Sequence, residues 1–288
     1  MRSSLPLFTV GFIVSLIISP ITSSITSLTS SSNFFLMPWM CLERCGDNST
    51  DIQYQIQQLT VNISKFTGVS FEDYNLGPNS TLIKNNLTQV ASLIPNTLQR
   101  WAMVSSYPYP PEFLYWMRDV FANPQPFINS CLAAAQTENL TGFNIDWEPT
   151  SGNGAPTPTP EDTINYSQFL HTFSQAMHQH GLLTSVDVAT WSPIWNYTLI
   201  GQTDIDYICT MGTYTSDDTT WYNQFNYGIQ NLPTEKYVVG LEIDDNINTT
   251  SLQYRFQAIK QANIRQIAIW RMTLPDFWWS FIDTFVGQ

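Results

Sequence analysis

Three polar residues, Asn144, Asp146 and Glu148, alternate with apolar ones along a short stretch of the chain. Because the side chains of a strand point alternately to its two faces, the polar groups share one face, and the two carboxyl groups are roughly 6–7 Å apart at Cα. Buried acids are costly unless they face a solvated site or are hydrogen-bonded. Like charges this close raise the pKa of one carboxyl group, which keeps it protonated. The pattern predicts acid catalysis with Glu148 as the proton donor.

Glu148 ends the fourth of eight short runs that are rich in β-branched and aromatic residues. The runs cover residues 34–40, 67–71, 100–107, 142–148, 183–191, 206–214, 237–243 and 266–272. Helical periodicity occurs at residues 51–65, 80–94, 111–138, 162–180 and 250–262, with Ser80, Asp162 and Thr249 as expected N-caps and Gly181 as a helix stop. Strands that alternate with helices pair in parallel through right-handed crossovers. Eight units favour a single α/β domain, a closed (β/α)8 TIM barrel, over a doubly wound open sheet.

This architecture would place the acidic stretch at a functional position, because the active sites of such barrels are built at the carboxyl ends of the strands. A half-buried strand whose polar face simply meets water would show the same alternation, but the position of Glu148 favours catalysis. The following loop, residues 149–161, is rich in Pro, Thr and Gly and is either a mobile rim or a surface insertion. The connection after the seventh strand is short, so no insertion domain is expected there.

The composition limits the possible partners. Of the 288 residues 43% are hydrophobic, which predicts a large core, and the net charge is −12 with only 11 Lys and Arg. A nucleic-acid partner is not expected, because no basic cluster could neutralise its phosphates. An acidic chain with ten tryptophans suits a neutral ligand such as a glycan.

The amino terminus has the features of a secretory signal peptide, predicted for residues 1–24, which leaves the (β/α)8 domain at residues 25–288. A signal anchor is the alternative, but the apolar stretch is short for about 30 Å of hydrocarbon, and no stable membrane insertion is expected after cleavage. Eight glycosylation sequons begin at Asn48, Asn62, Asn79, Asn86, Asn139, Asn165, Asn196 and Asn248. The sequence thus predicts a secreted or lysosomal glycoprotein.

The cysteines and histidines do not form a metal-binding pattern. The cysteines are Cys41, Cys45, Cys131 and Cys209, and the histidines are His171, His178 and His180 on one predicted helix. A bridge between Cys41 and Cys45 would close a small loop, and Cys209 is as compatible with a buried free thiol, so the connectivity stays open. Neither a metal nor a cofactor is expected, and the histidines are expected at the surface.

At the fourth strand the sequence resembles the chitinase-like glycoside hydrolase family 18. The family signature Asp-Gly-x-Asp-x-Asp-x-Glu is read here from Thr141 to Glu148. Gly142, Asp146 and Glu148 match it. Asn144 replaces the second aspartate, as in chitobiase-type members, and Thr141 replaces the first.

Two further strands extend the resemblance. Tyr214 matches the tyrosine of the family's Met-x-Tyr-Asp pattern on strand six, whereas Thr215 replaces its aspartate. Trp270, at the end of strand eight, matches the tryptophan that forms the floor of the −1 sugar site. The resemblance implies a retaining mechanism in which Glu148 protonates the leaving oxygen, Asp146 orients the substrate's own acetamide as nucleophile, and Tyr214 hydrogen-bonds the acetamide oxygen.

Aromatic residues at or just after the strand ends fit the faces of sugar rings, although core packing is the alternative for each. They are Trp39, Tyr107, Tyr109, Trp191, Trp195, Trp221, Tyr222 and Trp270. Trp270, Trp39, Tyr107 and Trp191 are predicted to bind substrate. Glu242, near the end of the seventh strand, is a rival catalytic carboxylate or else a rim residue.

The sequence thus predicts a retaining glycosidase that cleaves β-1,4-linked N-acetylglucosamine, in chitin oligomers or in the chitobiose core of N-glycans. Two alternatives stay open. One is a catalytically weak or inactive glycan-binding lectin on the same barrel, which the substitutions at Thr141 and Thr215 keep under consideration. The other is a barrel glycosidase of another family that acts on non-acetylated sugars.

Overall fold

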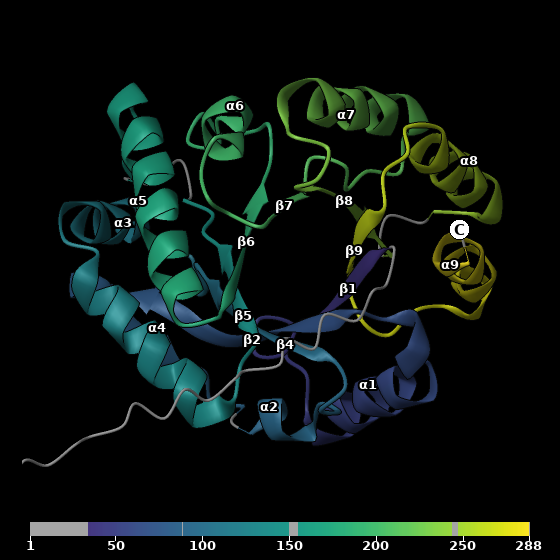
Figure 1. The fold of residues 1–288 in the computed structure, drawn as a ribbon, viewed down its shortest axis with the longest axis horizontal. Coiled ribbons are helices and arrows are strands. Elements are labelled where there is room, and N and C mark those ends of the chain that lie inside the picture. Colours follow the sequence, from purple (N-terminus) through teal and green to yellow (C-terminus); the bar gives the residue numbers. More distant parts are fainter. Residues whose placement is uncertain (1–33, 88, 150–154, 244–246, 288) are drawn as a thin grey trace, which may run out of the picture. The chain divides into compact units, whose positions relative to one another are not determined.

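A closed barrel of eight parallel strands forms the centre of the protein (Figure 1). The computed structural model describes residues 34–87, 89–149, 155–243 and 247–287. The barrel strands are β1 (Phe35–Met40), β2 (Gly68–Gly77), β4 (Gln99–Ser105), β5 (Gly142–Asp146), β6 (Leu183–Val188), β7 (Tyr207–Thr210), β8 (Tyr237–Glu242) and β9 (Gln266–Trp270). Strand β1 pairs with both β2 and β9, so the sheet closes and the predicted (β/α)8 barrel is confirmed.

Helices surround these strands in Figure 1. They are α1 (Ser49–Val61), α2 (Val90–Leu93), α3 (Phe113–Ala122), α4 (Gln125–Glu138), α5 (Pro160–Gln179), α6 (Tyr197–Gly201), α7 (Asp218–Asn231), α8 (Thr249–Gln261) and α9 (Trp279–Val286). Single turns of 3-10 helix lie at η1 (Ile63–Lys65), η2 (Pro78–Ser80) and η3 (Asp276–Trp278). Strand β8 leads to α8 by a short connection, without an inserted domain. In the part of the chain that is described, no helix has the length and apolarity to cross a bilayer.

Asparagine and threonine side chains fix where several helices begin. Asn48 caps α1 and Thr159 caps α5, each in a capping box closed by the acid three residues later. Asn248 caps α8 in the same way, without the reciprocal bond. The predicted caps Asp162 and Thr249 are therefore wrong by a few residues, because Asp162 is the acid that closes the Thr159 box.

Two helix predictions are wrong. Residues 81–84 of the predicted helix 80–94 form strand β3 (Thr81–Lys84), which pairs antiparallel with β2, and only α2 is helical. Ser80, the expected cap, has a positive φ of 60° in η2. The predicted helix 111–138 is two helices, α3 and α4, because Pro124 has no N–H for a continuous helix.

The core has two parts, one on each side of the barrel sheet. Outside the barrel, Trp147 stacks on Phe169 of α5 with centroids 4.9 Å apart. Inside it, a smaller cluster includes Trp39, Trp101 and Met103. Phe143 and Ile145 belong to the outer cluster, so the alternating face of β5 that carries Asn144 and Asp146 points into the barrel, as the sequence predicts.

Candidate active site

Strand β5 brings the acidic residues to the mouth of the barrel. Gly142 begins it, where a side chain would collide with the Leu183 carbonyl of β6 at 2.3 Å, so only glycine allows this strand contact. Asp146 is 2% exposed at the strand end. Glu148 lies two residues further on, with 25% of its side chain exposed. The deeper carboxyl group is thus shielded, and the outer one can be reached from solvent.

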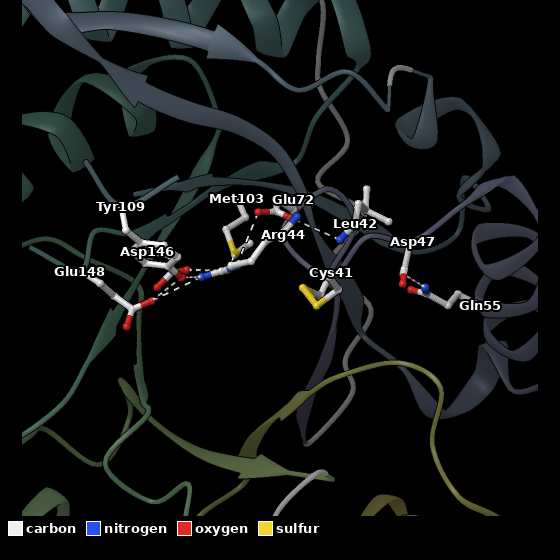
Figure 2. Close-up of a disulfide and its surroundings, with 11 residues drawn as sticks. Cys41, Leu42, Arg44, Asp47, Gln55, Glu72, Met103, Tyr109, Asp146 and Glu148 are labelled. Atoms are coloured by element: carbon white, nitrogen blue, oxygen red, sulfur yellow. Dashed lines mark hydrogen bonds and ion pairs between the residues drawn. A yellow bond between two sulfur atoms is a disulfide. The ribbon is translucent and has the colours of Figure 1, made fainter. Parts of the chain in front are cut away.

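An arginine that the sequence reading missed joins the two carboxyl groups. Arg44 lies on the loop after β1, inside the small ring closed by the disulfide Cys41–Cys45. Its Nη2 donates to Asp146 Oδ2 at 2.9 Å, and its Nη1 donates to Glu148 Oε1 at 3.3 Å (Figure 2). The sequence offers no periodic signal for this contact, because Arg44 and Glu148 are 104 positions apart.

Glu72 of β2 fixes the backbone that carries this arginine. Its Oε2 accepts hydrogen bonds from the backbone N–H groups of Leu42 and Arg44, both at 3.0 Å. Its Oε1 lies 3.5 Å from Arg44 Nε, at ion-pair distance. Burial raises the pKa of Glu72, while Arg44 and the two N–H groups act to lower it. The loop after β1 is thus attached to the barrel by a buried carboxyl group as well as closed by the disulfide.

Residues after β4 complete the surroundings of Glu148. The Tyr109 hydroxyl donates to Glu148 Oε1 at 3.4 Å and accepts a hydrogen bond from Arg44 Nη1. The backbone N–H of Glu148 donates to Ser106 Oγ at 3.2 Å. The Tyr107 ring lies edge-on to that of Tyr109, with centroids 6.3 Å apart. These contacts fix Glu148 from the segment after β4, and Tyr107, a predicted sugar-binding residue, packs against the same Tyr109 ring.

The electrostatics of Glu148 suit proton donation. Its pKa is raised to about 7, because burial and then the nearby Asp146 raise it more than Arg44 and Tyr109 lower it. A carboxyl group with such a pKa is largely protonated at mildly acidic pH and can donate its proton there. The like-charge effect expected from the sequence is present, but it is second to burial.

Asn144 lies at the centre of a buried hydrogen-bond network below the two acids. Its Oδ1 accepts from Trp39 Nε1 at 3.1 Å, and its Nδ2 donates to Ser185 Oγ and Asp187 Oδ1, both at 3.0 Å. Burial, followed by Asp146, raises the pKa of Asp187 well above its ordinary value. Asn144 therefore links β1, β5 and β6 beneath the mouth of the barrel. Trp39, only 1% exposed, supports this network from inside.

The other predicted site residues differ in how near they lie to Arg44 and the two acids. Trp270 ends β9, and its ring is 4.9 Å from the Arg44 guanidinium. Tyr214 is half-buried against β8, where a side chain at Gly240 would come within 2.8 Å of its ring. Burial and the proximity of Asp187 raise the pKa of Tyr214 well above its ordinary value. Trp191 is 59% exposed and packs edge-on against Trp195, away from these contacts.

Thr141, in the place of the first aspartate of the family signature, contacts β4 and not the acids. Its Oγ1 accepts from the backbone N–H of Arg100 at 3.0 Å. Cys131 and Cys209 are buried free thiols. Among the described residues, no three or more His, Cys, Asp or Glu side chains are grouped so that they could hold a metal ion.

Comparison with known proteins defines the fold. No family model matches the chain, and no curated protein matches it. Solved structures do: the Bacillus megaterium QM B1551 spore cortex-lytic enzyme SleL has a TM-score of 0.72 at 14% identity over 87% of this chain and 73% of that one. The Ostrinia furnacalis Group IV chitinase, solved with allosamidin, has a TM-score of 0.70 at 14% identity over 88% and 99%. The Nicotiana tobaccum class V chitinase, solved with NAG4, has a TM-score of 0.67 at 12% identity over 88% and 98%.

These likenesses span nearly the whole barrel. The chain therefore has a chitinase-like (β/α)8 fold, as the resemblance at the fourth strand implied. At the mouth of this barrel an arginine lies within hydrogen-bonding distance of both a protonatable carboxyl group and a buried second carboxyl group.

Proposed function

We propose that the protein is a retaining glycoside hydrolase that cleaves β-1,4-linked N-acetylglucosamine, in chitin oligomers or in the chitobiose core of N-glycans. The pairing of Glu148 with Asp146 carries the proposal. Glu148 is partly exposed and has a pKa of about 7, which suits a general acid. Asp146 Oδ1 is buried and accepts no hydrogen bond from any described residue, which leaves an acceptor for a substrate N–H.

The chemistry follows from these two groups. Glu148 donates its proton to the glycosidic oxygen as the bond from that oxygen to the anomeric carbon breaks. The carbonyl oxygen of the substrate's 2-acetamido group forms a new bond to the same carbon, which gives a cyclic oxazolinium ion. Asp146 Oδ1 accepts the acetamide N–H and stabilises the positive charge, and the Tyr214 hydroxyl donates to the acetamide oxygen.

Hydrolysis of the intermediate restores the enzyme. Water attacks the anomeric carbon, the bond to the acetamide oxygen breaks, and Glu148, now a carboxylate, takes the proton of the water. Two inversions at one carbon retain its configuration. This scheme needs one proton donor and no carboxylate nucleophile, unlike the two-carboxylate glycosidases. Glu242, at the end of β8, is thus not required as a second catalytic acid.

The solved structures give independent support for a carbohydrate ligand, because two of the chitinases with this fold were solved with allosamidin and with NAG4. Among the aromatics, we propose that Trp270, which lies under the Arg44 guanidinium, and Tyr107, which packs against Tyr109, contact a sugar bound at the acids. We propose Trp270 as the floor of the −1 site. Trp191 would reach only a more distant sugar unit, and Trp39 acts from below through Asn144.

Secretion or lysosomal delivery, with glycosylation at the sequons, remains part of this proposal. The predicted signal peptide, residues 1–24, lies outside the described residues. An acidic compartment would suit an acid catalyst whose pKa is about 7.

The test is hydrolysis of labelled chitotriose and of a high-mannose glycopeptide at acidic pH, with Glu148→Gln as the comparison. Loss of a general acid costs about 10²–10⁴-fold in rate, so the variant should release little product. A thiazoline analogue of the cyclic intermediate should inhibit the wild type. If the wild type binds both substrates without turnover, the proposed hydrolase activity is wrong and the protein is better described as a lectin. One observation favours the lectin: Arg44 forms ion pairs with both carboxyl groups that the catalytic mechanism needs.

A further inference from the structure

The Arg44 guanidinium lies where three parts of the proposed mechanism meet. It contacts Asp146 and Glu148 through hydrogen bonds, and it lies over the ring of Trp270 with Cζ 4.9 Å from the centroid. Its side chain is only 13% exposed, so it fills the space between these groups and is not a surface residue that reaches toward them. In Figure 2 the side chain runs from the disulfide loop directly to the two acids.

A sugar on Trp270 would need the same space. A cation at this distance from an indole face makes a cation–π contact. A pyranose stacked on the same face of the ring must displace the guanidinium. Trp39 also lies beside the ring, with centroids 6.3 Å apart, which limits the space on other sides.

A second location for the guanidinium already exists. Glu72 Oε1 is buried, accepts no hydrogen bond from any described residue, and lies 3.5 Å from Arg44 Nε. Nε likewise makes no hydrogen bond among the described residues. Glu72 Oε2 meanwhile holds the backbone N–H of Arg44. Glu72 thus offers the guanidinium a second carboxyl partner that needs no movement of the disulfide-closed backbone.

We propose that Arg44 is a positioning residue that yields its place to the substrate: sugar binding moves the guanidinium from Trp270, Asp146 and Glu148 onto Glu72, and so frees both acids only when a sugar is present. The inference rests on the proposed function and deepens it. It assigns to Arg44 and Glu72 a role that the resemblance at the fourth strand does not imply.

The exchange has an electrostatic consequence at Glu148. The groups that face this carboxyl are Arg44 from the loop after β1, Tyr109 from the loop after β4, Asp146 from β5 and Asp187 from β6. Arg44 is the only cation among them. Its departure would raise the pKa of Glu148, because Asp146 would then act without a neutralising charge. Substrate binding would thus protonate its own acid catalyst.

The first test compares pH profiles of the wild type with Arg44→Met and Arg44→Lys. The alkaline limb of kcat/KM reports the free enzyme and that of kcat reports the substrate complex. In the wild type the kcat limb should lie higher by about one pH unit, the usual effect of one nearby opposite charge. In Arg44→Met the kcat/KM limb should rise by about that amount while the kcat limb stays, and Arg44→Lys should restore much of the separation.

The matched control is Arg118→Met. Arg118 on α3 is paired with Asp162 of α5, away from the acids, so the variant loses an ion pair of the same kind. Its profiles should coincide with those of the wild type. Arg44→Met with a kcat/KM limb at the wild-type pH, or with both limbs shifted equally, would overturn the exchange.

A binding measurement separates this inference from the proposed function. Calorimetric titration of chitotriose into Glu148→Gln and into the double variant Arg44→Met/Glu148→Gln needs no turnover. Removal of the competing cation should tighten binding about tenfold, equivalent to about 1.4 kcal/mol. Equal affinities would overturn the exchange and leave the proposed function intact. No binding by either variant would overturn both.

Discussion

The pKa of Glu148 is set by burial, by Asp146 two positions before it, and by Arg44 and Tyr109 from distant parts of the chain. Burial and Asp146 keep its proton on, whereas Arg44 and Tyr109 favour its release. The balance places the pKa at about 7, and the proposed role of Glu148 as general acid requires its protonated form.

Hydrolysis should therefore be fastest below pH 7 and fall as the pH rises through about 7. Each pH unit above that value should reduce the rate about tenfold, because the protonated fraction falls in proportion. Initial rates at chitotriose concentrations well below KM, from pH 4 to 9, measure this limb for the free enzyme. A rate that stays constant up to pH 9 would show that Glu148 is not the general acid.

The sequence was sufficient to place Asp146 and Glu148 together at the end of the fourth barrel strand, because a strand places alternate residues on one face and the signature lies within a few positions. Arg44 and Glu72 could not be found in that way. They meet the acids from the loop after β1 and from β2, and their contacts depend on closure of the barrel. Tyr109 was recognised as an aromatic near a strand end, but its hydrogen bond to Glu148 follows from the backbone after β4.

At the scale of elements, the loop after β1 depends on its disulfide and on Glu72. Closing so short a ring contributes roughly 2 kcal/mol to the free energy of unfolding in the chain-entropy account. The same bond keeps Arg44 opposite the acids.

The double variant Cys41→Ser/Cys45→Ser should lose about that stability. Its kcat/KM limb should also move toward that of Arg44→Met, since Arg44 is less well held. Denaturant unfolding and the pH profile measure the two effects. Treatment of the wild type with mild reductant is the control and should reproduce both effects. It breaks only the Cys41–Cys45 bond, because the other two cysteines are buried free thiols. An unchanged pH profile would show that Glu72 alone positions the loop.

Most helices and strands could be predicted from the sequence pattern, and the predictions that were wrong have physical causes. Eight barrel strands are marked by runs of β-branched and aromatic residues that the parallel sheet buries. Strand β3 was mistaken for helix because it pairs only with β2, and that pairing depends on the turn before it. The break between α3 and α4 was marked by Pro124 and could have been predicted.

At the scale of the whole molecule, buried acids should link stability to pH. Asp73 of β2 lies beside Glu138 of α4 and Lys84 of β3, and burial followed by Glu138 raises its pKa to about 8. Between about pH 4 and 8 the folded chain binds more protons than the unfolded chain, so the stability is fully present below that range and is lost as the pH rises through it. Glu148 acts in the same direction up to about pH 7.

The melting temperature should thus be lower at pH 8 than at pH 5 by a few degrees, which corresponds to roughly 1–2 kcal/mol in a chain of this size. The effect is smaller than the shift alone suggests, because Asp73 shares its proton with Glu138, whose pKa is lowered. Thermal unfolding of the wild type and of Asp73→Asn measures it. The variant should show a flatter dependence, and a wild-type melting temperature that rises toward pH 8 would contradict the assignment.

Three of the asparagines that cap helices, Asn48, Asn196 and Asn248, are also exposed sequon residues. In each the side-chain oxygen makes the cap bond. An N-linked oligosaccharide is attached through the amide nitrogen, so the oxygen would stay available to the helix. Carbohydrate could thus be carried at these three positions without fraying the first turns of α1, α6 and α8, so the protein would display glycans on the helices that surround its barrel.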